Sequence, residues 1–141
     1  MEYHLGRLLD HVHIRVSDLD ESQRFYRTVL QSLGLDISGE GDGYFYADEL
    51  FFTADKEPTT GLHLAFQAEN RQEVHDFYAA GLAAGGTDYG APGERPQYHP
   101  GYFGAYILDP DGNNLEAVYH GRAERSAESV MVRPVDSPEE I

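Results

Sequence analysis

Two histidines and one glutamate in this chain could together bind a divalent metal ion. His11 and His63 each stand near the head of a short alternating segment, and Glu116 lies in a third such segment. Two imidazoles and one carboxylate suit Fe(II), Mn(II), Zn(II) or Ni(II), and they leave coordination positions open for water or substrate. Such an ion could polarise a substrate oxygen. A single strand histidine is more often an ordinary polar residue, so the prediction depends on all three side chains meeting.

The two histidines occupy equivalent positions in a repeat. Residues 11–34 read HVHIRVSDLDESQRFYRTVLQSLG, residues 63–86 read HLAFQAENRQEVHDFYAAGLAAGG, and the segments align without a gap. The alignment superposes the two histidines, a Phe-Tyr pair and a final glycine. Each copy is typical of a strand followed by a helix that stops at glycine. A repeat of this length predicts a duplicated unit, and pseudo-twofold packing of the copies would bring the histidines together.

The candidate ligands lie in segments that alternate between apolar and polar residues, at 9–16, 61–68 and 114–120. This period predicts strands that turn one face to the core and the other, with the ligands, to a cavity. Further strands are expected over 35–38, 44–47, 50–54 and 102–108. Helices are expected from a cap at Asp18 or Asp20 to Gly34, and over about 71–84. The segment Thr87–Gly101 is dense in Pro and Gly, which predicts mostly loop.

The order of these elements predicts an α+β fold. A strand, a helix and three strands occur twice, over about 9–55 and 61–120. Because a sheet must bury one face against helices, we expect one curved mixed sheet with the helices on its outer face and a cavity inside. Residues 1–120 are expected to form a single domain. Residues 121–141 are polar and acidic without periodicity, which indicates a loose tail or a segment folded over the surface.

The charge of the chain excludes several classes of partner. The net charge is −15, and binding to nucleic acid or to an anionic membrane surface requires the opposite sign. There is no cysteine, so disulfides and thiolate ligands are absent. The sequence also contains no apolar run long enough for a signal peptide or a membrane span. A cytoplasmic protein that binds a small molecule is the expectation.

Other polar side chains could line the same cavity. His13 and Arg15 share a strand face with His11, and Arg15 could pair with an anionic substrate group or with a surface acid. The hydroxyl groups of two tyrosines could reach the cavity, although packing explains them equally well. A Pro-rich loop with Arg95 and His99 could act as a lid. We therefore predict that the catalytic residues are Glu116, Tyr102 and His99, and that the substrate-binding residues are His13, Arg15, Tyr106 and Arg95.

Together, the His-headed strands, the Phe-Tyr pair and the string DPDGNNLEAV at 109–118 resemble the vicinal oxygen chelate superfamily. That group includes glyoxalase I, bleomycin and fosfomycin resistance proteins, and extradiol dioxygenases. The resemblance covers roughly Leu9 to His120. It implies paired βαβββ modules, a divalent metal ion on His11, His63 and Glu116, and a homodimer.

The resemblance leaves the reaction open. Glyoxalase I would supply a further carboxylate from the fourth strand, where this chain has Leu50-Phe51-Phe52-Thr53 with Glu49 only at the edge. The three-ligand set is closer to dioxygenases or to fosfomycin-type thiol transferases. Our leading hypothesis is a metal-dependent lyase, isomerase, thiol transferase or dioxygenase. The alternative is a metal-free sequestration protein of the bleomycin-resistance type. A third hypothesis is a subunit or regulatory module whose function is carried by the acidic tail.

Overall fold

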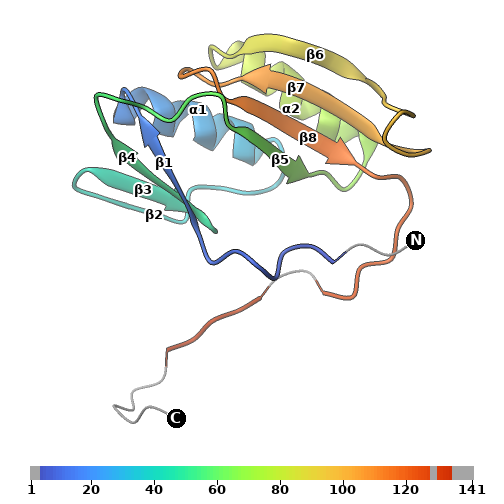
Figure 1. The fold of residues 1–141 in the computed structure, drawn as a ribbon, viewed down its shortest axis with the longest axis horizontal. Coiled ribbons are helices and arrows are strands. Elements are labelled where there is room, and N and C mark those ends of the chain that lie inside the picture. The colour runs from blue at the N-terminus through green and yellow to red at the C-terminus, as the bar shows by residue number, and fades with distance from the viewer. Residues whose placement is uncertain (1–3, 128–129, 135–141) are drawn as a thin grey trace.

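The computed structural model describes residues 4–127 and 130–134, and within them the chain forms two helices and eight strands (Figure 1). In chain order these elements are β1 (Val12–Val16), α1 (Leu19–Gln31), β2 (Gly39–Gly41), β3 (Tyr44–Ala47), β4 (Leu50–Ala54), β5 (His63–Gln67), α2 (Arg71–Ala83), β6 (Thr87–Glu94), β7 (Phe103–Leu108) and β8 (Asn114–Tyr119). Neither helix is long and apolar enough to cross a bilayer.

The strands form two mixed sheets with the same topology. The first sheet has the order β1-β4-β3-β2 and the second has the order β5-β8-β7-β6. In each sheet the first strand of the module runs parallel to the last and the other pairs are antiparallel. The α+β class and the two repeated modules are therefore confirmed. Among the described residues, no strand of one module pairs with a strand of the other. The chain therefore holds two four-stranded sheets in place of one curved sheet.

The two helices begin with equivalent caps, as the repeat requires. Asp18 accepts a hydrogen bond from the backbone N–H of Glu21 at 3.0 Å, and Asn70 accepts one from the backbone N–H of Glu73 at 2.8 Å. These side chains satisfy amide groups that the first helical turn leaves unpaired. After α1 the chain turns at Gly34, whose φ of 77° lies in the left-handed region that favours glycine.

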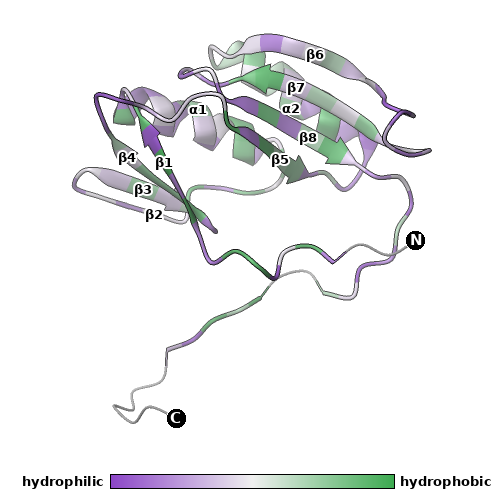
Figure 2. Cartoon of the chain, in the orientation of Figure 1, coloured by the Kyte–Doolittle hydropathy of each residue, from purple (hydrophilic) through white to green (hydrophobic). Residues whose placement is uncertain are grey.

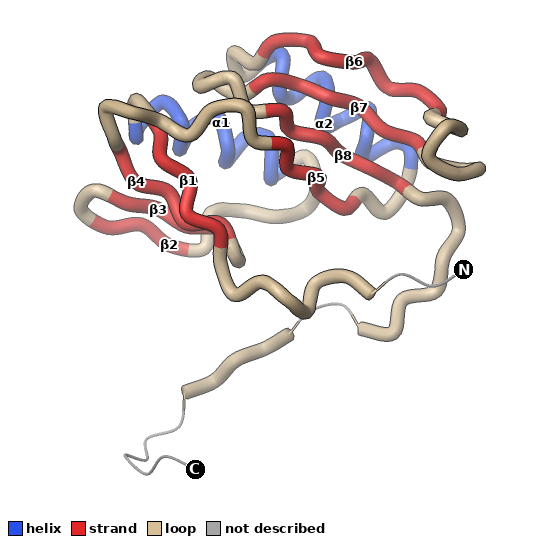
Figure 3. The backbone as a smooth tube through the Cα atoms, in the orientation of Figure 1, coloured by secondary structure: helices blue, strands red, loops and turns tan. Residues whose placement is uncertain are grey.

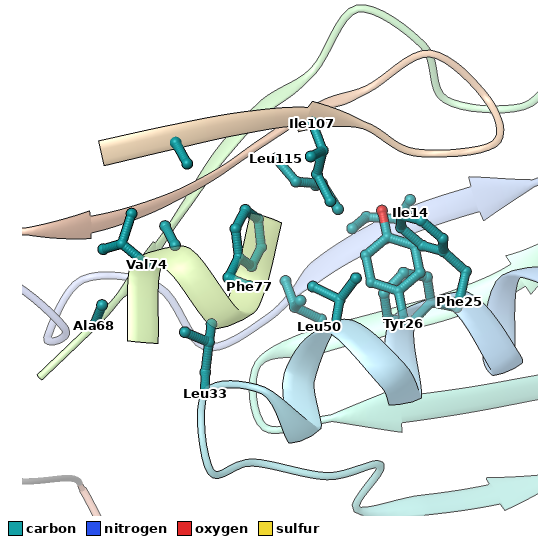
Figure 4. Close-up of a cluster of buried hydrophobic side chains, with 14 of the residues drawn as sticks. Ile14, Phe25, Tyr26, Leu33, Leu50, Ala68, Val74, Phe77, Ile107 and Leu115 are labelled. Atoms are coloured by element: carbon teal, nitrogen blue, oxygen red, sulfur yellow. The ribbon is translucent and has the colours of Figure 1, made fainter. Parts of the chain in front are cut away.

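The modules are joined through their helices and one shared core. Helix α1 packs against α2, and α2 packs against β6, β7 and β8. Figure 4 shows Phe25 and Tyr26 of α1 near Ile14 of β1, with Phe77 of α2 between α1 and the second sheet. These side chains are buried and belong to one continuous hydrophobic cluster. Apolar burial of this kind is the main driving force that holds the two sheets in one body.

Two local predictions of the sequence were wrong. The strand expected over 35–38 lies at β2, a few residues later, and residues 87–94 of the expected loop form the long strand β6. β6 pairs with β7 with register shifts at Gly90 and Gly93. It is the outer strand of its sheet, and Pro92 falls in the irregular stretch between Gly90 and Gly93, a position at which proline is tolerated. Tertiary pairing therefore overrides a loop-like local composition.

Both terminal segments are loops that leave the same side of the molecule (Figure 3). Of the expected acidic tail, residues 121–127 and 130–134 contain no helix or strand. The other positions of that tail lie outside the described residues.

A buried carboxylate links the last hairpin to the first module. Tyr26 in α1 donates a hydrogen bond to Oδ2 of Asp109 at 2.5 Å, and Asn113 donates to the same oxygen at 3.0 Å. Asn113 also donates to the carbonyl of Thr59 in the linker between the modules, at 2.9 Å. Burial, followed by the negative charge of Asp109, raises the pKa of Tyr26 well above its usual value. The string that begins DPDG therefore acts structurally here, as a clamp between the modules.

Replacing Tyr26 with Phe tests this clamp. The substitution removes one donor from a buried carboxylate, so we expect it to lower the free energy of unfolding by about 1–3 kcal/mol. Urea unfolding followed by circular dichroism measures the change. The matched control is Tyr89→Phe, at a side chain that is 61% exposed, and it should unfold as the wild type does. Equal midpoints for Tyr26→Phe and the wild type would contradict the clamp.

Candidate functional site

Glu116 lies in the middle of β8 and is buried, with 1% of its surface exposed. Its neighbours Leu115 and Ala117 point into the core, so the alternation of the strand turns Glu116 to the opposite face of the sheet. Figure 2 shows that hydrophilic residues interrupt the hydrophobic colouring of β8. Gly104 in β7 leaves room for the carboxylate, since a Cβ atom there would lie 3.2 Å from Oε2 of Glu116.

Both oxygens of this carboxylate have partners on the flanking strands. Nε2 of His63, at the start of β5, lies 2.8 Å from Oε1. The hydroxyl of Tyr102, just before β7, donates a hydrogen bond to Oε2. A buried carboxylate is costly unless it is paired and hydrogen-bonded, and these two contacts provide that compensation. The structure therefore brings the side chains of His63, Glu116 and Tyr102 into contact.

Two tyrosines beside the carboxylate hold their protons strongly. Burial raises the pKa of Tyr106 to about 12, with the negative charge of Glu116 as the next cause. Burial, then the hydrogen bond to Glu116, raises the pKa of Tyr102 even further. At neutral pH both hydroxyl groups are protonated donors. The guanidinium of Arg95 lies 5.5 Å from the centre of the Tyr106 ring, so this residue also borders the site.

The pair formed by His63 and Glu116 fits two adjacent ligands of one metal ion. Two donor atoms at right angles, each about 2.1 Å from an ion, would lie about 3 Å apart, and the observed separation is 2.8 Å. The side chain of His63 is 52% exposed, so the pair is open to solvent on one side. An imidazole nitrogen with a carboxylate oxygen suits a first-row divalent ion. A third protein ligand would complete the set expected from the sequence.

His11 does not join this pair within one chain. Across residues 4–127 and 130–134, no three histidine or acidic side chains lie close enough to hold a metal ion. His11 precedes β1 and lines a hollow on the other sheet with Tyr46, Asp48 and Phe51. The expectation that all three ligands meet in one hollow of a single chain is thus not met. The physical reason is that β1 and β5 are edge strands of separate sheets and do not pair with each other.

The other candidates on β1 also belong to the first sheet. Nε2 of His13 lies 2.7 Å from the hydroxyl of Thr53, and Nε of Arg15 lies 3.8 Å from Asp55. Both strand neighbours of His11 are therefore separated from Glu116 in the same chain, and Arg15 has the surface acid as its partner.

His99 reaches the site indirectly. Its Nδ1 donates to the carbonyl of Pro100 at 2.8 Å, and its Nε2 lies 2.8 Å from Nδ1 of His120. Burial, then the neighbouring His99, lowers the pKa of His120. The ring of His99 contacts that of Tyr102, with centroids 5.4 Å apart. This histidine pair therefore borders the tyrosine that holds Glu116.

The sequence analysis overlooked two residues of this arrangement. Asp10 accepts a hydrogen bond from Nδ1 of His11 at 2.7 Å, and Gly104 makes room for Glu116. A carboxylate beside a candidate histidine ligand is a recognisable signal, because metal-binding histidines usually donate their second N–H to such a group. Gly104 carries no such signal, since its role depends on the strand opposite.

Comparison with known proteins identifies the family. The model of the "Glyoxalase/Bleomycin resistance protein/Dioxygenase superfamily" matches residues 8–117, most of the chain. The chain belongs to this superfamily, which is the vicinal oxygen chelate group.

Relatives within this superfamily cover nearly the whole fold. The metallothiol transferase FosB of Shouchella clausii (strain KSM-K16) is 28% identical over 134 residues, which is 89% of each protein. A glyoxalase/bleomycin resistance protein from Albidiferax ferrireducens T118 is 30% identical, with a TM-score of 0.66 over 79% of this chain and 98% of that one. A glyoxalase/bleomycin resistance protein/dioxygenase family enzyme from Burkholderia phytofirmans PsJN has a TM-score of 0.62 over 77% of this chain and 95% of that one. At 22% identity, this similarity is evidence for the fold only.

Tyrosine titration tests the electrostatics of the site. Tyr106 should ionise at about pH 12, later than exposed tyrosines at about pH 10. Glu116→Gln should lower the pKa of Tyr106, because a negative charge next to the phenolate is removed, although burial remains. The folded protein keeps the hydroxyl proton of Tyr106 to a higher pH than the unfolded chain does. The free energy of unfolding should therefore fall as the pH rises from about 10 to about 12. Tyrosinate absorbance measures the ionisation.

The control for this titration is Tyr89→Phe, at a side chain that is 61% exposed, and it should leave the late transitions unchanged. An unshifted late transition in Glu116→Gln would show that the carboxylate does not act on Tyr106.

Proposed function

We propose that this protein is a divalent-metal-dependent enzyme acting on a small oxygen-bearing substrate. The observation that carries the proposal is the pair formed by His63 and the buried Glu116, with 2.8 Å between the two donor atoms. In this proposal a homodimer supplies the third ligand: His63 and Glu116 of one chain and His11 of a second copy hold the same ion. The closed twofold symmetry of such a dimer would create two equivalent sites.

The state of His11 supports its role as the third ligand. Because Nδ1 donates to Asp10, the remaining Nε2 carries the lone pair that a metal ion needs. The His11 side chain is 64% exposed, so another chain can reach it. Leu8 and Leu9, just before it, are 93% and 65% exposed, which is unusual for large apolar side chains next to a structured strand. An edge strand with this flank is suited to contact a second copy.

The reaction class follows from the chemistry of the site and from one relative. When bound, the ion would act as a Lewis acid on a substrate oxygen. Tyr102 fixes the orientation of Glu116 by occupying Oε2, and its protonated hydroxyl group keeps the other oxygen directed at His63. Thiol transfer is supported by the similarity to a metallothiol transferase. The chain has no cysteine, so a thiol would come from a cosubstrate.

A metal-free binding protein is the second candidate. It is favoured by the hydrogen bond between His63 and Glu116, which satisfies both groups without an ion. The two candidates differ in what happens to that hydrogen bond. A metal ion on this pair would need the lone pair of Nε2, so the proton there would move to Nδ1 and the hydrogen bond to Glu116 would be lost.

Metal analysis of purified protein decides between these functions. We expect about one divalent ion per chain in the wild type, and little in His63→Ala or Glu116→Gln, because each removes a donor. Elemental analysis and calorimetric titration of chelator-treated protein give the stoichiometry and the affinity. His75→Ala, at an exposed histidine of α2, is the control and should bind as the wild type does. Equal metal content in all four proteins, or a metal-free wild type that binds small molecules, would overturn the enzyme.

A heterodimer of two variants, each lacking one proposed ligand, tests whether the metal site is shared between chains. His11→Ala chains retain His63 and Glu116, whereas Glu116→Gln chains retain His11. A heterodimer purified through two different tags would then contain one complete site and one that lacks both groups. We expect it to bind about half of the metal of the wild-type dimer, although each variant alone binds almost none. A heterodimer as empty as its parents would contradict a site shared between chains.

A further inference from the structure

Four aromatic rings form a continuous surface on the first sheet, on the face that carries His13. The rings of Tyr44 and Tyr46 lie within 15° of parallel, with centroids 6.4 Å apart, and those of Tyr44 and Phe51 within 23°, at 5.6 Å. His13 meets Phe51 edge-on at 5.5 Å. These side chains are at least partly exposed, unlike Phe45 and Phe52, which alternate with them and are fully buried. We refer to His13, Tyr44, Tyr46 and Phe51 as the aromatic platform.

Glycines in β2 allow the tyrosines of the platform to lie flat on the sheet. A Cβ atom at Gly39 would lie 2.5 Å from Cζ of Tyr46, and one at Gly41 would overlap the ring of Tyr44. A side chain at either position would force the tyrosine ring to shift, so the rings occupy the space above these two glycines. One face of each ring rests on β2, and the opposite face points away from the sheet. A row of nearly parallel, partly exposed rings is a surface on which another ring could stack.

A hollow lies at one end of the platform. It has a volume of about 310 Å³ and is lined by Tyr46, Phe51, His11 and Asp48. Two of these residues are aromatic, and the other two place an imidazole and a carboxylate at the rim. Asp48 has a φ of 47°, a left-handed conformation that a turn between β3 and β4 imposes. The combination of apolar walls with a few polar groups at the edge is typical of small-molecule sites.

We propose that this hollow binds the aromatic ring of a small, planar, non-anionic molecule that carries a hydroxyl group. The ring would stack on Tyr46 and Phe51, and its hydroxyl would donate to the carboxylate of Asp48. The ligand is small, one or two rings, because the hollow is at the lower end of the range of about 300–1,000 Å³ for such sites. It is not an anion, because Asp48, the nearby Asp10 and a net charge of −15 would repel one.

His11 connects this hollow with the proposed function. It lines the hollow and is the proposed third metal ligand, so a ring bound there would hold its oxygen substituents beside the ion. That this ring belongs to the substrate rests on the proposed metal site. That the hollow binds aromatic rings does not, and it can be measured on protein from which metal has been removed.

The experiment uses chelator-treated full-length protein with 2-naphthol and its fully saturated analogue, decahydro-2-naphthol. Both carry a hydroxyl group on a two-ring skeleton, but only the first is flat and aromatic. We expect 2-naphthol to bind about tenfold more tightly, and Tyr46→Leu to remove that advantage, because stacking requires a ring. Ligand-observed NMR or calorimetry gives both dissociation constants.

Two further variants complete the test. Gly39→Ala should also weaken the binding of 2-naphthol, since the new methyl group lifts the Tyr46 ring from the sheet. Tyr89→Leu changes an exposed tyrosine of β6 and should bind both ligands as the wild type does. Circular dichroism confirms that each variant is folded. Equal affinity for the two ligands, or an unchanged preference in Tyr46→Leu, would overturn the aromatic site. If a second copy of the chain covered the platform, neither ligand could reach it, and the absence of binding would also overturn the aromatic site.

The measurement also separates the two proposals. If 2-naphthol binds the metal-free protein but His63→Ala and Glu116→Gln contain as much metal as the wild type, the aromatic site stands and the metal site fails. If metal binds normally and 2-naphthol does not, the reverse holds.

Discussion

The burial of Glu116 is the constraint around which the second module is built. A carboxylate with 1% of its surface exposed is costly in a protein interior unless each oxygen has a partner. His63 and Tyr102 supply those partners from the strands on either side. This requires β8 to lie between β5 and β7, which is the order observed. The same requirement explains Gly104, since a side chain there would crowd the carboxylate.

The two modules share a topology but differ in the chemistry of the corresponding sheet face. In the second module this face carries a carboxylate, an imidazole and protonated tyrosines. In the first module it carries the aromatic platform, with His11 at the edge. A duplicated scaffold has thus kept its strand order and its helix caps while its two faces have become polar and aromatic. Differences in function are expected from these side chains, because the two modules share their strand order.

The way in which the modules are joined determines what one chain can do alone. They are connected by helix packing, by one shared core and by the clamp at Asp109, and among the described residues no strand of one sheet pairs with a strand of the other. This arrangement leaves β1 and β5 as edge strands, and it separates the two repeat-equivalent histidines. Edge strands are surfaces that natural proteins usually cover or pair. The separation of His11 from Glu116 in one chain and the open edges therefore have the same cause.

The sequence by itself determined the elements that depend on local physics. Alternation placed Glu116 and His63 on one sheet face, Asp18 was one of two residues predicted as the cap, and the gapless repeat predicted two modules of one topology. Only the tertiary structure decided features that depend on distant partners. Strand β6 forms in a Pro- and Gly-rich segment because β7 lies beside it, and the tyrosine rings lie flat because β2 offers glycines beneath them. The position of His11 relative to Glu116 is the clearest case. A repeat in sequence specifies what each module is, whereas the packing between modules, set by the helices and the core, specifies which residues meet.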